Sequence, residues 1–358
     1  MDWTFFQILW FILIAVLWTV FLVLEGFDFG VGMLLPFVAK NDAERTQATR
    51  TIGPHWDGNE VWLLTAGGAT FAAFPEWYAT MFSGMYLALF LVLVALILRI
   101  SALEWRSKLA TAKWRGIWDG IHTVCAYLVP LLLGVAFANL VHGMAIEVVD
   151  GVHQLTGGFF SLLNLYTLLG GVVVLAVCFA HGAQFLSLKT EGAVRERANA
   201  ISGPASIVAT VLAAVLLVWG QFVYTSNVLA WIPLVIAALA IIASAAFSQP
   251  ALRSEGKAFV FSSVAIAATV AWIFSAMAPA VMKSSLDPAA SLTIAQASST
   301  QSTLQVMTIV ALCFVPVVLA YTIWSYWVFR KRVSVNDIDE NAGLLPGKIR
   351  LDKNFLVG

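Results

Sequence analysis

Ionisable residues gather at the same ends of four neighbouring apolar runs, where charged side chains are rare. They are Glu25 and Asp28 at the end of the first run, His55, Asp57 and Glu60 at the start of the second, Arg99 and Glu104 at the end of the third, and Asp119 and His122 at the start of the fourth. Charged groups in a bilayer are costly, so they pair or line a path for ions or protons. These residues therefore indicate a site for ion or proton transfer.

Two interpretations of this cluster stay open at the level of sequence. In the first, Asp28, Asp57 and Asp119 conduct protons, because transfer through an apolar barrier needs closely spaced titratable groups or waters. Arg99 is then their electrostatic partner, Glu25 and His55 lie near the entrance, and Glu60 and Glu104 are further candidates. In the second, Asp28 and Asp119 only pair with Arg99 and fix packing, while Glu25, Asp57 and Glu60 are solvated at helix ends.

The elements that must position these residues are membrane-spanning helices. Hydrophobic residues make up 60% of the sequence and charged residues only 11%, which is too few for the surface of a soluble protein. The formal net charge is zero, which argues against a nucleic-acid partner. Apolar runs close to spanning length, on the order of 20 residues, lie at 3–24, 61–74, 77–98, 117–140, 159–185, 207–224, 229–247, 259–277 and 303–329. The second run is the shortest and needs residues from about Gly53 onward.

Basic residues predict the orientation of these runs. With the N-terminus outside, all of the 20 basic residues except Lys283 fall on the inside, where cytoplasmic loops collect Lys and Arg. This predicts nine spanning helices with the C-terminus inside. Residues 1–332 form the transmembrane domain, with a charged half at about 1–140 and an apolar half at about 159–332, followed by a cytosolic tail at 333–358. The loop at 278–302 is predicted to be exposed and poorly structured.

The sequence lacks the usual signatures of a redox centre. Haem-binding bundles usually supply paired histidines on facing helices, and no two runs here offer such pairs. We interpret His122 and His181 as core histidines bonded to backbone carbonyls, with haem ligation as the alternative. Cys125, Cys178 and Cys313 lie in apolar runs without a CxxC pairing, which favours small apolar core residues.

At these segments the sequence resembles subunit II of the cytochrome bd-type quinol oxidases. The run Pro-His-Trp-Asp-Gly-Asn at 54–59 is the most specific match, and Glu25 departs from the Asp that many members carry. The similarity extends to about Arg332, and its matching segments are 25–33, 53–63, 67–69, 71–75, 105–108, 114–119, 134–137 and 181–192.

The resemblance implies an all-α membrane protein of nine transmembrane helices, arranged as two four-helix bundles plus one peripheral helix. It implies a bacterial cytoplasmic membrane complex that oxidises quinol and reduces dioxygen to water. Two b-type haems and one d-type haem belong to the partner subunit I, none is ligated by this chain, and some members hold a structural quinone. Small accessory subunits and membrane lipid are further expected partners.

Two other functions remain beside this one. A structural scaffold would use Asp28, Asp119 and Arg99 only for packing. An ion-coupled secondary transporter would use the carboxylates for coupling, but it would favour inverted repeats and two broken helices, whereas only one half of this sequence carries the charges.

Overall fold

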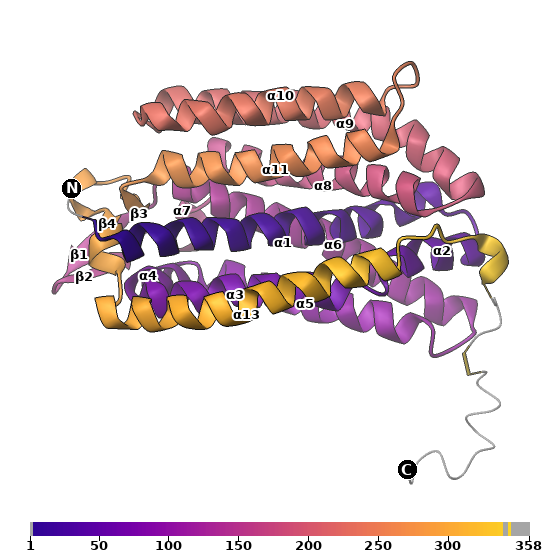
Figure 1. Ribbon diagram of the computed structural model, residues 1–358, viewed down its shortest axis with the longest axis horizontal. Coiled ribbons are helices and arrows are strands. Elements are labelled where there is room, and N and C mark those ends of the chain that lie inside the picture. Colours follow the sequence, from indigo (N-terminus) through magenta and orange to yellow (C-terminus); the bar gives the residue numbers. More distant parts are fainter. Residues whose placement is uncertain (1–2, 339–342, 345–358) are drawn as a thin grey trace, which may run out of the picture.

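The computed structural model describes residues 3–338 and 343–344, and it is a bundle of long helices that run along one direction (Figure 1). The long helices are α1 (Phe5–Val38), α3 (Trp56–Ala73), α5 (Tyr86–Arg106), α6 (Ala112–His142), α8 (Leu165–Lys189), α9 (Gly192–Val223), α10 (Trp231–Ser248), α11 (Glu255–Met277) and α13 (Gln301–Val328). Shorter elements are α2 (Asp42–Ile52), α4 (Pro75–Gly84), α7 (Gly158–Ser161), α12 (Ile294–Ala297) and the strands β1 (Ile146–Val149), β2 (Val152–Leu155), β3 (Ala280–Met282) and β4 (Leu292–Thr293).

Eight helices in the described part of the chain are long and apolar enough to cross a membrane, namely α1, α5, α6, α8, α9, α10 with its preceding turn, α11 and α13. The predicted second span corresponds to α3, which has 18 residues and a length of about 27 Å at about 1.5 Å per residue. Asp57, Asn59 and Glu60 in its first turns lower its mean hydropathy. The chain is thus an all-α membrane protein, as the sequence predicts.

Two predicted boundaries are wrong, and both affect the candidate site. The first helix does not end near Leu24 but continues to Val38, so Glu25 and Asp28 lie inside a long helix and not at its end. The third run is divided. The division lies at Met85, between α4 and the span α5, which starts at Tyr86. Helix α4 begins just before the predicted run, because Phe74 has a non-helical backbone and Pro75 occupies the first helical position, where proline is favoured.

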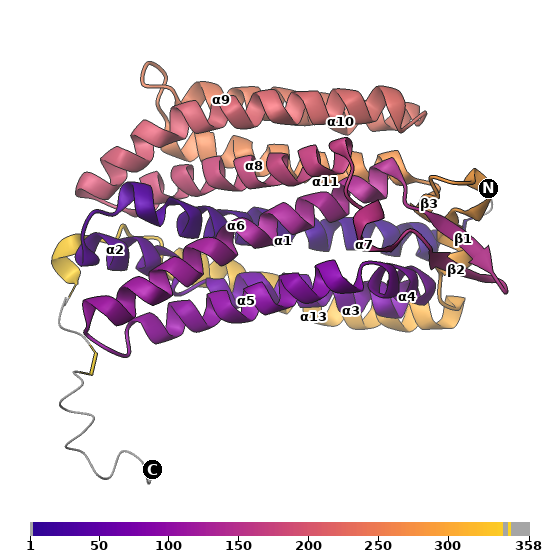
Figure 2. The ribbon, with the colours of Figure 1, turned by 180° about the vertical axis from the view of Figure 1, so that it is seen from behind.

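Helix α1 lies at the centre of the bundle. It packs against α3, α6, α8 and α11, and α5 packs against α6 (Figures 1 and 2). The later helices α8, α9, α10 and α11 pack against one another in turn. Helix α13 lies along α1 and α3, and of its residues only Leu304 is buried. Helices from both halves of the sequence therefore enclose the Glu25 to Gly30 segment of α1.

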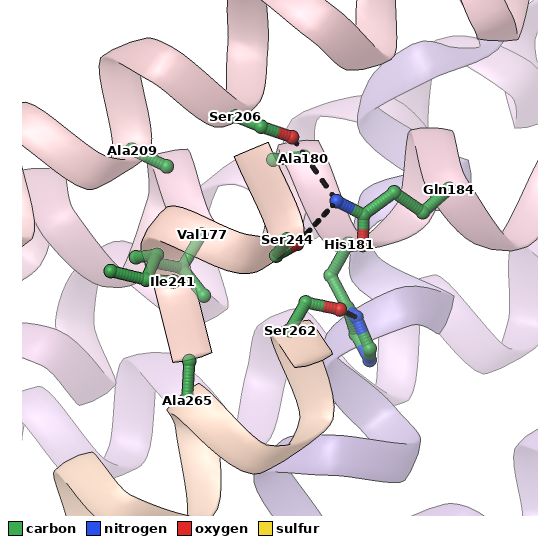
Figure 3. Close-up of a pocket in the computed structure, with 10 residues that line it drawn as sticks. All are labelled: Val177, Ala180, His181, Gln184, Ser206, Ala209, Ile241, Ser244, Ser262 and Ala265. Atoms are coloured by element: carbon green, nitrogen blue, oxygen red, sulfur yellow. Dashed lines mark hydrogen bonds between the residues drawn. The ribbon is translucent and has the colours of Figure 1, made fainter. Parts of the chain in front are cut away.

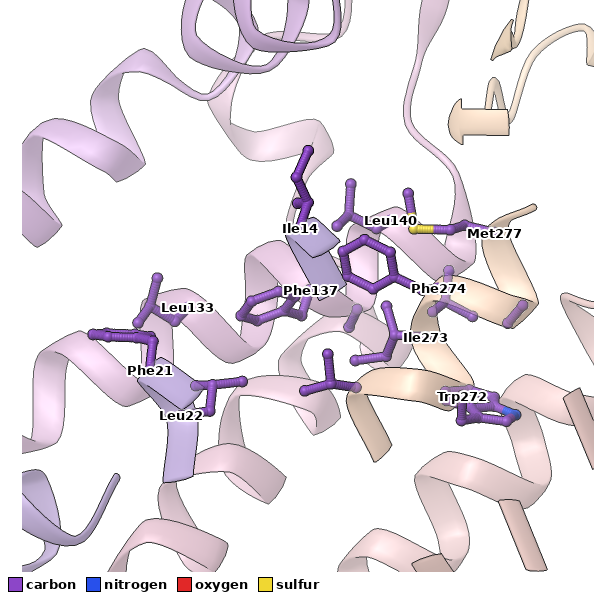
Figure 4. Close-up of a cluster of buried hydrophobic side chains, with 14 of the residues drawn as sticks. Ile14, Phe21, Leu22, Leu133, Phe137, Leu140, Trp272, Ile273, Phe274 and Met277 are labelled. Atoms are coloured by element: carbon purple, nitrogen blue, oxygen red, sulfur yellow. The ribbon is translucent and has the colours of Figure 1, made fainter. Parts of the chain in front are cut away.

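The core between α1, α6 and α11 is apolar and well filled. Ile14 of α1 lies beside Phe274 of α11 and Phe21 of α1 lies beside Leu133 of α6, and all of these are buried (Figure 4). Further along α1 the helices approach closely. A Cβ at Gly30 would overlap the backbone of α8 at Gly182, so this crossing depends on glycine.

The end of the bundle near the N-terminus is closed by an ordered cap (Figure 1). The prediction that 278–302 is poorly structured is wrong, since it contains β3, β4 and α12 and buries Val281 and Leu292. The Ser284 hydroxyl donates to the Ile146 carbonyl at 2.7 Å, which joins this loop to β1. The pairing of β3 with β4 and the burial of these two apolar side chains order the loop, although its composition is polar.

Most residues of the predicted tail lie outside the described part of the chain. Among those described, Val333 donates its amide to the Lys189 carbonyl at 2.8 Å.

A buried ion-pair cluster as the candidate functional site

The deeper part of the site is built by α1, α3 and α5. Glu25 of α1 forms an ion pair with Arg99 of α5, and both side chains are completely buried. Glu60 of α3 lies 3.9 Å from the same guanidinium, measured from Oε2 to Nη1. The Arg99 guanidinium also stacks over the Phe29 ring, 4.7 Å from its centroid. The Arg99 guanidinium thus lies next to two carboxylates and one aromatic ring.

Asp28 lies one turn from Glu25 on the same face of α1, because residues three apart are neighbours on a helix. It is completely buried, and its Oδ2 accepts a hydrogen bond of 2.7 Å from the Asn59 amide. The side-chain oxygen of Asn59, Oδ1, in turn accepts a hydrogen bond from the Tyr326 hydroxyl at 2.7 Å. The Tyr326 ring stacks on His55 with 4.1 Å between centroids. This chain of contacts links the buried carboxylate to the connection between α2 and α3.

His55 lies at that connection, buried and outside the helices. Burial and, to a lesser degree, the charge of Lys189 lower the pKa of His55 to about 4. The imidazole is therefore neutral at neutral pH, and it can accept a proton only transiently.

Several polar atoms in this deeper part have no hydrogen-bond partner among the described residues. They are Glu60 Oε2 and Arg99 Nε and Nη2, whereas Glu25 and Asp28 contact each other and His122 contacts the Arg99 backbone. Leaving a buried polar group unpaired costs about 1–3 kcal/mol, and more for a charged group. Buried groups of this kind in proteins are generally satisfied by ordered water. These atoms are concentrated around one guanidinium.

A second group of charges lies nearer the basic end of the bundle. Arg106 Nε donates to Asp119 Oδ1 at 2.5 Å, and Arg45 lies 3.1 Å from Asp119 Oδ2. Arg106 also contacts Asp42 at 2.6 Å, and Arg115 pairs with Asp42. We call Asp42, Arg45, Arg106, Arg115 and Asp119 the surface network, and Glu25, Asp28, Asn59, Glu60 and Arg99 the deep cluster.

The expected convergence of all site residues is therefore only partly observed. Asp119 does not pair with Arg99 but with Arg106. Arg106 lies seven positions after Arg99 along α5, which corresponds to about 10 Å. Asp57 lies on an exposed side of the first turn of α3, and Glu104 is also exposed. Glu25, Asp28, Glu60 and Arg99 are brought together as predicted.

Asn59 and Tyr326 were missed by the sequence analysis. Asn59 lies inside the run at 54–59, so its position one turn after His55 could have signalled a role. Tyr326 comes from the far end of the chain, and sequence spacing gives no signal for such a contact.

A polar cluster in the later helices was also missed. Gln184 donates to Ser206 at 3.1 Å, to Ser244 at 2.9 Å and to Ser248 at 3.2 Å, beside a small cavity (Figure 3). His181 lies 2.6 Å from the Ser262 hydroxyl and 3.1 Å from the Val23 carbonyl. The contact with a carbonyl agrees with the interpretation of His181 as a core histidine.

Comparison with known proteins gives a consistent result. A family described as cytochrome bd terminal oxidase subunit II matches residues 6–329. The chain is 42% identical to cytochrome bd ubiquinol oxidase subunit 2 of Bacillus subtilis, covering 91% of this chain and 96% of that protein. It is 38% identical to cytochrome bd-I ubiquinol oxidase subunit 2 of Escherichia coli K12, covering 95% and 98%. A chain in the structure of the bd oxidase from Geobacillus thermodenitrificans has the same fold, with a TM-score of 0.72, 15% identity and coverage of 92% and 100%.

Proposed function

This chain belongs to the cytochrome bd terminal oxidase subunit II family, and we propose that its deep cluster supplies a proton-uptake route to the oxidase complex. As a member of this family, it is a subunit of a terminal quinol oxidase, an oxidoreductase of respiratory electron transport. Reduction of dioxygen to water consumes protons, so the complex needs a path along which they reach the reaction site.

The observation that carries this proposal is the group of three carboxylates around the buried Arg99, whose Nε and Nη2 have no hydrogen-bond partner among the described residues. Water that satisfies these atoms would connect Glu25, Asp28 and Glu60 by hydrogen bonds, and protons move along such chains. Asp57, exposed one turn before Glu60 on α3, is suited to collect protons from the aqueous side. The proposed order is Asp57, then Glu60 or Asp28, then Glu25.

The charge balance of the deep cluster also favours this role. Glu25, Asp28 and Glu60 share the positive charge of Arg99, and an uncompensated charge is costly in a buried site. Taking up a proton reduces the excess negative charge, whereas Arg99 keeps one carboxylate ionised. The cluster can therefore exchange protons without leaving a large net charge.

The roles proposed for Asp119 and His55 are less direct. Asp119 contacts two arginines, and the surface network holds three arginines against two aspartates, so we keep Asp119 in the proposal as an entrance carboxylate that takes a proton only when one of these ion pairs opens. His55 is neutral at neutral pH and stacks on Tyr326, so it positions the Tyr326 hydroxyl beside Asn59.

The rest of the redox chemistry is proposed to lie in the partner subunit I. Two b-type haems and one d-type haem would be held there, and none by this chain. A structural quinone and small accessory subunits are further proposed components. Large apolar side chains on α3 and α5, such as Leu64, Phe71 and Tyr86, are more than half exposed, and subunit I or lipid would cover them in a bacterial plasma membrane.

For the topology, we propose nine spans with the N-terminus outside and the C-terminus inside. Helix α3 would be the ninth, since its polar first turns pack on α1 and contact Arg99 of α5. A polar helix start is tolerated in a membrane when its charged groups face the bundle interior. The charged and apolar halves would then each supply four of these helices, with α13 at the periphery.

The test uses Asp28→Asn, Glu25→Gln and Asp57→Asn in the whole complex. We expect normal haem content, but quinol oxidase turnover and proton uptake reduced by at least about tenfold for the first two, a change of about 1.4 kcal/mol in barrier. Asp57→Asn should have a smaller effect, because water can replace an exposed collector. Glu196→Gln, an exposed carboxylate at the same end of the bundle, is the matched control.

The main alternative is a scaffold, and the dense ion pairs of the surface network favour it. On that view, Asp28→Asn and Glu25→Gln would lose haem or fail to assemble. Full haem content with unchanged turnover and proton uptake would exclude the conduit.

A further inference from the structure

A large groove lies at the cap end of the bundle, away from the deep cluster and the surface network. It has a volume of about 730 Å³, within the range of about 300–1,000 Å³ that is typical of ligand sites. Its walls are the start of α1, the end of α11 and the connection between α9 and α10, all on one side of the bundle (Figure 1). Ile8, Ile12, Phe11 and Phe274 make these walls largely apolar.

One cation, Lys283, lies in this groove. Its ammonium donates to the Tyr224 carbonyl at 2.8 Å and to the Ala276 carbonyl at 2.6 Å, which leaves a third proton available. Within residues 3–338 and 343–344 it forms no ion pair. Burial lowers the pKa of Lys283 to about 8, so the side chain is still mostly charged at neutral pH.

Two other polar side chains of the groove, Asn227 and Ser275, are paired within the protein. The Asn227 amide donates to the Ser275 carbonyl at 2.8 Å, and its oxygen accepts from the Leu229 amide at 3.0 Å. The Ser275 hydroxyl donates to the Ala271 carbonyl at 2.7 Å. The groove therefore offers one charged donor, the Lys283 ammonium, beside an extended apolar surface, with Trp3, Tyr224, Thr225 and Ser226 as further polar side chains of its lining.

We propose that this groove binds an anionic glycerophospholipid, with a phosphate oxygen on the Lys283 ammonium and an acyl chain along α1 and α11. A partly buried ammonium without a counter-charge favours an anion. The exposed Ile8 and Ile12 favour a chain that remains in the bilayer. Trp3 and Tyr224 at the mouth of the groove are the residue types that lie at headgroup level.

Charge distribution supports an anionic lipid over a neutral amphiphile. Every other basic residue in the described part of the chain lies toward the opposite end of the bundle, so Lys283 is isolated from the charges that act elsewhere. A neutral isoprenoid would occupy the apolar walls, but it would leave this ammonium without a counter-charge. The lipid proposal is independent of the proton route.

The test measures lipid bound to the whole complex by native mass spectrometry after delipidation and titration with phosphatidylglycerol or phosphatidylcholine. Lys283→Met should weaken phosphatidylglycerol binding by about tenfold or more, since a hydrogen bond to a charged group contributes at least that much. Lys283→Arg should retain most of the binding. Lys257→Met, an exposed lysine at the other end of α11, is the control and should bind as the wild type does.

A second variant keeps the test decisive if Lys283→Met does not assemble. Ser275→Phe narrows the groove without removing the backbone carbonyl that Asn227 uses, and it should also reduce bound phosphatidylglycerol. Equal binding of phosphatidylglycerol by the wild type and the altered complexes would overturn the proposal. So would equal affinity of the wild type for the two lipids, or a neutral isoprenoid that stays in the groove throughout the titration.

Discussion

At the scale of single residues, Arg99 supplies the positive charge that the carboxylates of the deep cluster share. Its guanidinium is completely buried, and it approaches Glu25, Glu60 and the ring of Phe29. Desolvating an arginine and a glutamate is repaid only when their geometry and remaining hydrogen bonds are good. Because Arg99 Nε and Nη2 have no partner among the described residues, the pair depends on water or a further group to be stable.

This argument predicts strong coupling between Arg99 and Glu25. Arg99→Met alone should lower the melting temperature of the complex markedly, because breaking a buried pair costs about 3–5 kcal/mol. The double variant Arg99→Met with Glu25→Gln should recover much of that loss, since no buried charge then remains at either position. Thermal unfolding followed by haem absorbance checks this. Additive losses in the double variant would mean that the two side chains stabilise the protein separately.

The residue types of the cluster could be predicted from the sequence, but some partners could not. Glu25, Asp28 and Arg99 stand out because charge is rare in apolar runs. The choice between Arg99 and Arg106 as the partner of Asp119 depends on a shift of two turns along α5, which composition does not encode. Tyr326 reaches Asn59 only through the fold.

At the scale of helices, the crossing of α1 and α8 positions the deep cluster. Gly30 and Gly182 let the two backbones meet, and this contact lies one turn or less from Asp28. The ionisable residues of this segment stand out in the sequence, but Gly182 does not, because only the packing shows which glycines face another helix. The continuation of α1 to Val38 was missed because the glycines and carboxylates at 25–30 resemble a helix end, yet tertiary packing buries them.

We therefore predict that Gly182→Ala is destabilising. Its Cβ would overlap the Gly30 backbone, and inserting atoms into a filled interface costs about 1–3 kcal/mol. The matched control is Gly120→Ala on α6, where a Cβ would meet nothing within 4 Å. That change should be neutral or stabilising, because alanine favours a helix over glycine by about 1 kcal/mol. The melting temperatures of the two altered complexes give the comparison, and equal values would show that the crossing tolerates separation.

At the scale of the whole molecule, the two ends of the bundle differ in chemistry. The surface network and the contacts of Arg332 with Glu255 and Thr190 gather positive charge at one end. The other end carries the ordered cap, the groove and Lys283. Cytoplasmic segments are enriched in Lys and Arg, so in the proposed topology the deep cluster lies nearer the cytoplasmic side, from which an oxidase can draw the protons it consumes.

The number of spans depends on α3, because eight helices satisfy length and hydropathy without it. If α3 crosses the membrane, the connections before and after it lie on opposite sides. Lys40 precedes α3 and Ser83 follows it, and both are exposed. In a background with Cys313→Ser, we expect a membrane-impermeant thiol reagent applied outside to label Ser83→Cys but not Lys40→Cys until the membrane is opened.

Reporters on either side of α13 complete this prediction. An insertion after the exposed Leu286 should be active only as an external reporter such as alkaline phosphatase. A fusion after Gly358 should be active only as an internal reporter such as green fluorescent protein, because nine crossings from an external N-terminus end inside. Labelling of Lys40→Cys and Ser83→Cys from the same side would show that α3 does not cross the membrane. The entrance of the proton route would then lie at the membrane surface. Reporters that agree on one compartment would contradict the proposed topology, because α13 would then not cross the membrane.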